Sequence, residues 1–468
     1  MQEFAPRERA VIILGSTGSI GTQALDVISR RRDSYRVVGL GAGGANLELL
    51  ADQAISFNVP VLAVANPDAA VPLAALLAER APGQLFQILS GPDAMSELAG
   101  GWASLSTNNP ESVGGPLRGQ ATSSSSPMST STHSSDSVVG PLRRQATSSS
   151  SLMSTSTHSS DSVVVLNGIT GSVGLQPTLT ALRSGATLAL ANKESLVVGG
   201  GLIKEAMTRP GQIVPVDSEH SAIAQALRSG IHHRGLTSEN LDGHSEVRRI
   251  ILTASGGPFR GKKRADLAGV TAAQALNHPT WDMGPVVTIN SSTLMNKGLE
   301  LIEAAYLFDV DPRDIVPVVH PQSIIHSMVE FIDGATIAQA SPPDMRLPIA
   351  LGLSWPERLD NITAPNVWDS PVAWHFEPLD HETFPAVRLA REAVASSPLH
   401  PAVLNAVNEE CVAAFLSGEL PYLAITDVVE SVLGEFTAPA GTLDLETVLG
   451  TEKWARTRAH EVMSARLR

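Results

Sequence analysis

The chain has 468 residues, and 33 Lys and Arg against 47 Asp and Glu give it a formal charge of −14. This length allows about two to four domains, and the acidic balance argues against broad binding to nucleic acid or anionic lipid, which both require clustered basic residues. The single cysteine, Cys411, excludes an internal disulfide framework and a multi-cysteine metal site. No apolar run has the length of an export signal or of a spanning helix, so we expect a cytoplasmic protein without a membrane segment.

The first 217 residues alternate between predicted strands and helices. The strands are short apolar runs of the kind that is buried on both faces of a sheet. This alternation predicts an α/β fold, a Rossmann-like doubly wound parallel sheet. Strands are expected at 10–14, 36–40, 61–64, 86–88, 163–166, 187–190 and 213–216, with helices near 22–32, 47–56, 69–79, 93–98 and 175–184.

A duplicated low-complexity segment interrupts this pattern. Residues 116–140 recur at 141–165 with 22 of 25 positions identical, and the fifty residues contain 18 Ser and 6 Thr. Such a composition cannot form a core, so we predict a disordered insert at about 105–162. It leads into a predicted strand, and we therefore expect it to attach at the N-terminal edge of the sheet, away from the edge where ligands bind.

The pattern changes after about residue 217. Helices are expected at 221–228 and 297–307 and a strand at 249–252, followed by an aperiodic stretch at 355–380 that contains Pro and Trp. Helices are then expected at 384–394, 402–416, 422–433 and 445–466. We predict a nucleotide-binding domain at 1–217, an α+β domain at 218–354, a linker at 355–380 and a helical domain at 381–468.

Three glycines follow the first predicted strand and open the first helix. The spacing Gly15-x-x-Gly18-x-x-Gly21 lets a backbone turn and a helix N-terminus approach a pyrophosphate, although a plain Gly-rich turn is the alternative. The second strand ends in residues 41–46, which lack the carboxylate that would hold the ribose of NAD, so NADP is favoured. This loop has no basic residue, and Arg32 and Arg36 are only nearby.

Asp217-Ser218-Glu219 follows a predicted strand and carries two carboxylates. In an extended segment, residues two apart point the same way, and paired carboxylate oxygens suit Mg²⁺ or Mn²⁺. The alternative is that Asp217 or Ser218 caps the next helix, and this pattern taken alone favours the cap.

Further polar motifs could bind an anion or the reacting groups. Asn296, Lys297 and Glu300 share one side of a predicted helix, where the alternative is a surface ion pair. Small residues around Ser255 could turn N–H groups toward an anion, although a plain turn would look the same. Lys193 follows a strand at the ligand-binding edge, or is a surface lysine. His278 and Trp281 could close over a ligand or simply pack a loop.

Together these motifs resemble one family, 1-deoxy-D-xylulose 5-phosphate reductoisomerase. The resemblance lies in residues 15–21, 190–197, 214–222, 252–261, 278–284, 295–300, 320–328 and 341–348, which span nearly the whole chain. It implies that the keto-sugar phosphate is rearranged and then reduced by NADPH to 2-C-methyl-D-erythritol 4-phosphate, in the non-mevalonate route to isoprenoids. It also implies a homodimer.

The resemblance implies roles for residues at matching positions. Asp217, Glu219 and Glu300 would bind Mg²⁺ or Mn²⁺, with Co²⁺ as a further candidate, and Lys193 would contact the reacting oxygens. The implied substrate contacts are Ser218, Ser255, His278, Trp281, Ser291, Asn296 and Lys297. The implied NADPH contacts are Gly15, Ser16, Thr17, Gly18, Ser19, Ile20, Gly21, Gly43, Asn46, Asn192, Glu194 and Met283, and Met345 would lie near the site.

Two departures and two alternatives accompany this resemblance. Some relatives have a lysine in the loop after the second strand, and relatives join residue 98 to the strand at 163 by a short connection. The alternatives are a different NADPH-dependent oxidoreductase, such as a semialdehyde dehydrogenase, and a non-catalytic NADPH-binding scaffold. Many semialdehyde dehydrogenases use a catalytic cysteine, and Cys411 lies far from every motif in the sequence.

Overall fold

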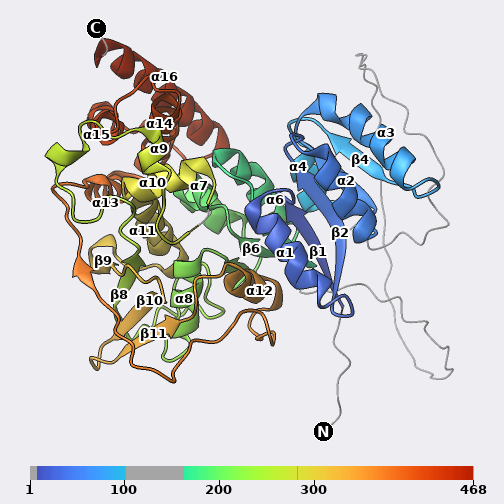
Figure 1. The fold of residues 1–468 in the computed structure, drawn as a ribbon, viewed down its shortest axis with the longest axis horizontal. Helices are drawn as coiled ribbons and strands as arrows, with labels where there is room; N and C mark the ends of the chain where they lie inside the picture. Colours follow the sequence, from blue (N-terminus) through green and yellow to red (C-terminus); the bar gives the residue numbers. More distant parts are fainter. Residues whose placement is uncertain (1–7, 102–162, 282, 467–468) are drawn as a thin grey trace, which may run out of the picture.

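The computed structural model describes residues 8–101, 163–281 and 283–466, which form the coloured ribbon in Figure 1. The predicted insert at about 105–162 lies outside the described residues. Among the described residues, no helix combines the length and the apolar character needed to cross a membrane.

Among the described residues, seven parallel strands confirm the predicted doubly wound sheet. Their order is β4-β3-β2-β1-β5-β6-β7, so the direction of winding reverses between β1 and β5. The predicted strands are all present, with ends that differ by a few residues. Their bounds are β1 Arg9–Leu14, β2 Tyr35–Ala42, β3 Val61–Val64, β4 Gln87–Ser90, β5 Val163–Asn167, β6 Thr187–Leu190 and β7 Ile213–Pro215.

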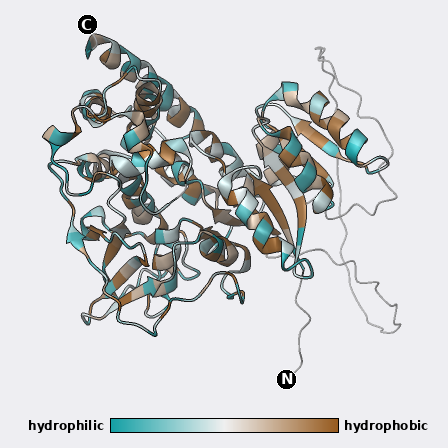
Figure 2. Ribbon diagram, in the orientation of Figure 1, coloured by the Kyte–Doolittle hydropathy of each residue, from teal (hydrophilic) through white to brown (hydrophobic). Residues whose placement is uncertain are grey.

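Helices cover both faces of this sheet because side chains alternate along each strand. In β1, Val11 and Ile13 pack into one apolar cluster while Ile12 and Leu14 pack into the other. The helices α1 Ser19–Ser29, α2 Leu47–Ser56 and α3 Ala70–Arg80 lie on the first face, and α4 Ala94–Gly100, α6 Leu175–Arg183 and α7 Lys193–Ala206 on the second. The buried strands stand out as hydrophobic in Figure 2.

The helix α12, Arg346–Ser354, also packs on the first face of this sheet. Its Ile349 and Leu353 are fully buried in the same cluster as Val11 and Ile13. A segment from the end of the predicted second domain therefore covers the sheet of the first. The domain boundaries expected from the sequence, at 217, 354 and 380, therefore remain predictions.

In the part of the chain that the structure describes, the second sheet has five strands in the order β11-β10-β8-β9-β12. The strands β8 and β9 are parallel and the other pairs antiparallel. The short β12 lies inside the stretch that was predicted to be a linker, because Glu377 and Pro378 pair with β9. The bounds are β8 Val247–Ala254, β9 Ile315–Val319, β10 Ile325–Phe331, β11 Thr336–Ala340 and β12 Glu377–Pro378.

Helices lie beside the second sheet and form the C-terminal region (Figure 1). The predicted helices of this part are present as α8 Ser218–Leu227, α11 Met295–Phe308, α13 Ala386–Ser396, α14 His400–Leu416, α15 Ala424–Glu435 and α16 Leu445–Arg466. Two shorter helices are α9 Ala272–Ala275 and α10 Pro285–Ser292. Single 3₁₀ turns occur at η1 Pro67–Ala69, η3 Ser172–Gly174, η4 Arg264–Leu267 and η5 Pro312–Asp314.

The C-terminal region braces α10 through buried hydrogen bonds from α14 and from the segment before α15. The Asn408 side-chain amide donates to Asn290 Oδ1 at 2.9 Å, and the Tyr422 hydroxyl donates to the backbone oxygen of Ser292 at 2.7 Å. Both bonds flank Ser291, so the helical region fixes the position of this predicted substrate contact.

Candidate functional site

A cavity of about 710 Å³ opens where the turns after β1 and β5 meet the second sheet. This is the point at which the strand order reverses, the usual place for a ligand in an open α/β sheet. Most of the residues predicted from the sequence line it. They are Gly18, Ser19, Ile20, Lys193, Glu194, Asp217, Ser218, Glu219, Ser255, Trp281, Met283, Ser291, Asn296, Lys297 and Glu300.

The Gly-rich turn packs too tightly for side chains. A Cβ on Gly15, whose φ is +84°, would lie 2.7 Å from the backbone oxygen of Gly168. A Cβ on Gly21 would lie 2.4 Å from the backbone oxygen of Gly15. The turn is built by residues that do not line the cavity themselves, namely Gly15, Ser16, Thr17 and Gly21. This packing leaves the N-terminus of α1, with its N–H groups, facing the cavity.

The loop after β2 has no charged group for a cofactor phosphate. Gly43 and Asn46 do not line the cavity, and Asn46 Oδ1 accepts a hydrogen bond from the Leu49 N–H at 3.1 Å as the cap of α2. Arg32 follows α1 and Arg36 begins β2, so both lie at the opposite edge of the sheet from the Gly-rich turn. Neither arginine is placed to hold a 2′-phosphate.

The residues at the start of α7 hold two loops together. The Asn192 side-chain amide donates to the backbone oxygens of Ile169 and Gly171 at 2.8 and 3.0 Å and to Glu194 Oε2 at 2.8 Å. Asn192 is buried outside the cavity lining, so its side chain positions the turn after β5, which lines the cavity. Burial raises the pKa of Glu194 to about 7.

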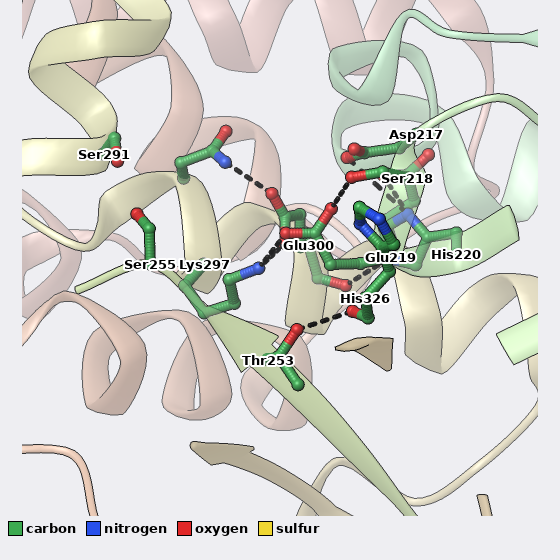
Figure 3. A network of polar contacts seen from close by, with 12 residues as sticks. Asp217, Ser218, Glu219, His220, Thr253, Ser255, Ser291, Lys297, Glu300 and His326 are labelled. Carbon is green, nitrogen blue, oxygen red and sulfur yellow. Dashed lines mark hydrogen bonds and ion pairs between the residues drawn. The ribbon is translucent and has the colours of Figure 1, made fainter. Parts of the chain in front are cut away.

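Asp217 occupies the cap position of α8 but makes no capping hydrogen bond. The helix begins at Ser218, so the segment is not extended, and Asp217 stands at the cap position that the pattern taken alone favoured. The first turn of the helix, rather than strand alternation, brings Glu219 toward Asp217. Oxygen atoms of Asp217, Glu219 and Glu300 all lie within 4.8 Å of one another, as Figure 3 shows for the three labelled side chains.

Two lysines offset the charge of these carboxylates, and the lysines and one asparagine align them through hydrogen bonds. Lys193 Nζ lies 2.8 Å from Asp217 Oδ2, donates to Glu300 Oε1 at 3.2 Å and donates to Asn296 Oδ1 at 2.8 Å. Lys297 Nζ donates to Glu219 Oε1 at 2.7 Å and also contacts Glu300. Asn296 donates to Glu300 as well, so the predicted common side of α11 is confirmed.

Burial and mutual charge perturb this cluster. Burial opposes the charged form of Lys193, but Asp217 and Glu300 outweigh it and raise the pKa of Lys193 well above its ordinary value. Burial also acts against the Asp217 carboxylate, yet Lys193 and His220 hold its pKa well below the usual range. Burial and the neighbouring Glu219 raise the pKa of Glu300 to about 7.

The three carboxylates fit a divalent metal. All their donor atoms are hard oxygens, which suit Mg²⁺ or Mn²⁺. Asp217 Oδ2 is buried and makes no aligned hydrogen bond in spite of its contact with Lys193, and Glu300 is almost fully buried. A bound cation would satisfy this oxygen and relieve the repulsion that raises the pKa of Glu300.

A second polar group lies beside the carboxylates. Ser255 at the end of β8 and Ser291 on α10 each have their hydroxyl oxygen 3.1 Å from Nε2 of His278. Nδ1 of His278 accepts from the N–H groups of Thr280 and Trp281 at 3.1 and 2.8 Å, so the ring proton resides on Nε2 and points at the serines. This arrangement presents donors to an anion. His278 itself lies just behind the cavity lining.

The segment between α9 and α10 forms one wall of the cavity. Trp281 and Met283 line it and are partly exposed. The Trp281 ring lies 6.2 Å from the ring of His326, which lines the cavity from β10. Met345, just before α12, also lines the cavity. Large side chains from separate segments thus enclose the space between the Gly-rich turn and the carboxylates.

Sequence reasoning assigned no role to several lining residues. Gly168, Ile169 and Thr170 form the turn after β5, and a signal for them was the strand end beside the Gly-rich turn. His326 lies within residues 320–328, a stretch that carries the family resemblance but from which no role for this histidine was predicted. Arg346 pairs with Asp26 on α1 at 2.6 Å, a contact across 320 positions that no local pattern could reveal.

Comparison with known proteins gives consistent results. A family model described as 1-deoxy-D-xylulose 5-phosphate reductoisomerase matches residues 11–104 and 132–200. Models for C-terminal domains of the same enzyme match residues 213–308 and 340–458. The sequence is 53% identical to the 1-deoxy-D-xylulose 5-phosphate reductoisomerase of Beutenbergia cavernae, over 97% of this chain and 98% of that protein. It is 49% identical to the Cutibacterium acnes enzyme, over 98% and 100%.

Solved structures show the same fold. The reductoisomerase of Zymomonas mobilis in complex with NADPH has a TM-score of 0.75 at 36% identity, covering 98% of this chain and 99% of that one. A reductoisomerase in complex with NADPH, fosmidomycin and magnesium has a TM-score of 0.75 at 30% identity, covering 97% and 98%.

Proposed function

The chain belongs to the 1-deoxy-D-xylulose 5-phosphate reductoisomerase family, and we propose how its residues carry out that reaction. It is an NADP-dependent oxidoreductase that uses NADPH and a divalent metal. It converts 1-deoxy-D-xylulose 5-phosphate to 2-C-methyl-D-erythritol 4-phosphate by isomerisation and then hydride reduction, in non-mevalonate isoprenoid biosynthesis. The observation that carries the assignment is the convergence of three carboxylates, an anion-binding group and a Gly-rich turn in one cavity.

Asp217, Glu219 and Glu300 are proposed to hold Mg²⁺ or Mn²⁺, or alternatively Co²⁺. When bound, such an ion polarises the substrate carbonyl and orients the neighbouring oxygens. Lys193 lies beside the same carboxylates and keeps its proton, so it donates a hydrogen bond to the reacting oxygens. The Ser218 hydroxyl, which hydrogen-bonds Glu219, is placed to contact the substrate between the ligands.

The substrate phosphate is proposed to bind in the group formed by Ser255, Ser291, Asn296 and Lys297. In Figure 3, Ser255 and Ser291 lie on one side of the carboxylates, with Lys297 between Ser255 and Glu300. The Nε2 proton of His278 points into the same group. Binding energy from this phosphate, remote from the reacting carbons, supports positioning for the chemistry.

NADPH is proposed to bind along the Gly-rich turn, with its pyrophosphate at the N-terminus of α1. Gly18, Ser19 and Ile20 line the cavity there, and Gly15, Ser16, Thr17 and Gly21 build the turn. Asn192 and Glu194 shape the neighbouring wall. Gly43 and Asn46, in the loop after β2, are proposed to contact the ribose of the cofactor. Trp281 and Met283 on the wall between α9 and α10 are proposed to close over the reactants and exclude water.

The competing cysteine mechanism receives no support from the site. Cys411 is buried on α14 outside the cavity lining, and burial raises the pKa of its thiol to about 12. The protonated thiol at neutral pH is a poor nucleophile. A non-catalytic scaffold would have no use for a buried carboxylate triad with its own lysines.

A homodimer, a cytoplasmic location and the three-part domain division remain proposals. Exposed apolar side chains on the segment before β12 support a partner contact, since Val367, Trp368, Val372 and Phe376 are 65, 66, 56 and 44% exposed. Two separate sheets and a C-terminal set of helices support the division. Light scattering after size-exclusion chromatography would measure the oligomeric state.

The function is tested by NADPH oxidation in the presence of 1-deoxy-D-xylulose 5-phosphate, with Mn²⁺ or with a chelator. We expect turnover only with the metal, and its absence with metal present would contradict the assignment. Glu219→Gln and Glu300→Gln should each abolish most activity, and Glu410→Gln, an acid on α14 outside the cavity lining, serves as the control. Full activity in Glu219→Gln and Glu300→Gln would refute the proposed assignment of these residues as metal ligands but would not affect the assignment of the chain to its family.

A further inference from the structure

A fourth carboxylate lies directly behind the three proposed metal ligands. Glu303 is one turn after Glu300 on α11 and is only 1% exposed. It does not line the cavity, so it is not placed to touch the substrate. Between it and the ligands lies His220 on α8, which is fully buried. In Figure 3, His220 lies beside Asp217 and Glu219.

His220 contacts three of these acidic residues. Its Nε2 lies 2.9 Å from the backbone oxygen of Glu300. Its Nδ1 lies 3.0 Å from Glu303 Oε2 and 3.8 Å from Asp217 Oδ2. The contact between Nδ1 and Glu303 is an ion-pair contact. It is not an aligned hydrogen bond, and among the described residues neither His220 Nδ1 nor Glu303 Oε2 has another hydrogen-bond partner. The ring therefore bridges α8 and α11 at the level of the proposed ligands.

This bridge ties together two ligands that come from different helices. Asp217 precedes α8 and Glu300 lies on α11, so their spacing depends on how these helices are held. His220 fixes the backbone of Glu300 from one ring nitrogen and faces Glu303 and Asp217 with the other. Groups behind metal ligands commonly set ligand orientation in this way, and their loss typically lowers metal affinity about 10- to 100-fold.

We propose that Glu303 is a positioning residue, which acts through His220 to hold Asp217 and Glu300 at the spacing that binds the divalent metal. This inference rests on the proposed metal site. Neither Glu303 nor His220 reaches the cavity, so neither contributes to substrate or NADPH binding directly. The effect of removing Glu303 should therefore fall on metal affinity.

A second metal ion is the competing explanation for the same atoms. Atoms of Asp217, His220 and Glu303 also lie within 4.8 Å of one another. However, neither His220 nor Glu303 lines the cavity, and the 3.0 Å between His220 Nδ1 and Glu303 Oε2 is a direct imidazole–carboxylate contact that requires no ion. A direct contact therefore accounts for the arrangement without a second ion, and the stoichiometry of binding distinguishes the two explanations.

The test is a Mn²⁺ titration of metal-free full-length protein, in which electron paramagnetic resonance counts the unbound ion. Wild type should bind one Mn²⁺, and Glu303→Gln should bind one with about 10- to 100-fold lower affinity. The matched control is Glu452→Gln, a buried acid on α16 that pairs with Arg456, and its Mn²⁺ affinity should equal that of wild type. The KM for Mn²⁺ should rise in Glu303→Gln while NADPH affinity, measured by fluorescence, is unchanged.

Several outcomes would overturn the proposal. Mn²⁺ affinity within twofold of wild type in Glu303→Gln would show that the spacing does not depend on this residue. Two Mn²⁺ in wild type and one in Glu303→Gln would show a second ion instead. If Glu303→Gln does not fold, His220→Asn removes the same bridge and is judged by the same measurements. Failure of wild type to bind Mn²⁺ would refute the proposed metal site as well, whereas binding and turnover with an unaffected variant would refute this inference alone.

Discussion

Raising the pH from 6 to 8 should strengthen Mn²⁺ binding to the metal-free protein. Burial, together with the charge of Glu219, raises the pKa of Glu300 to about 7. Below that pH a proton occupies the carboxylate that the metal needs, so proton and metal compete. The ionised fraction is about one-tenth at pH 6 and about nine-tenths at pH 8, so affinity should rise about tenfold, or about 1.4 kcal/mol. The affinity is thus lost as pH falls through 7.

Lys193 and Asp217, two other charged groups of the cluster, should not contribute to this change. The pKa of Lys193 is raised and that of Asp217 is lowered, so both keep their charges between pH 6 and 8. Isothermal titration calorimetry at several pH values measures the affinity. Glu300→Gln should bind more weakly and lose the dependence. Glu194→Gln is the control, because Glu194 also has a pKa of about 7 but lies outside the carboxylate triad. A flat profile in wild type, or one abolished by Glu194→Gln, would refute the reasoning.

Three further predictions concern the Gly-rich turn, the C-terminal region and the duplicated segment. Gly21→Ala places a Cβ 2.4 Å from the Gly15 oxygen and so displaces the Gly-rich turn, and the NADPH affinity measured by fluorescence should fall at least about tenfold. The control Gly434→Ala has open space around its Cβ and should leave the NADPH affinity unchanged. Equal NADPH affinities in the two variants would contradict the packing argument. Tyr422→Phe removes the hydrogen bond to Ser292 and should lower the free energy of unfolding in urea by about 1–3 kcal/mol, and no change would show that the bond contributes nothing. Deleting 116–140 should leave kcat and KM nearly unchanged, since β5 begins at Val163 at the edge opposite the cavity; a large loss in folded protein would contradict this placement.

Much of the first sheet could be predicted because its signals are local. The apolar run at 10–14 and the glycines after it specify a buried strand and a tight turn within about a dozen residues. The common side of Asn296, Lys297 and Glu300 follows equally from helical spacing. These features need no knowledge of distant parts of the chain.

Asp217 shows where local patterns fail. Its position favoured a helix cap, and it does occupy the cap position, yet its side chain makes no capping bond. The Lys193 ammonium group and the carboxylate of Glu300, from other elements, decide what the side chain does. Only the family resemblance, which implies Glu300 as a third ligand, favoured a metal pair over a helix cap.

Contacts between distant segments lay beyond sequence reasoning. Arg346 meets Asp26 across 320 positions, and α12 covers a sheet from which it is separated in the chain. The bridge from Glu303 through His220 to Glu300 likewise depends on how two helices cross. Such pairings are determined by tertiary packing rather than by spacing along one element.

The central claim is that Asp217, Glu219 and Glu300 hold the divalent metal. The most direct measurement is an anomalous difference map from crystals of active protein grown with Mn²⁺. One peak bounded by oxygens of these three residues is the expected result. A peak held instead by Asp217, His220 and Glu303, or no peak at the triad in crystals of protein that turns over, would contradict the account.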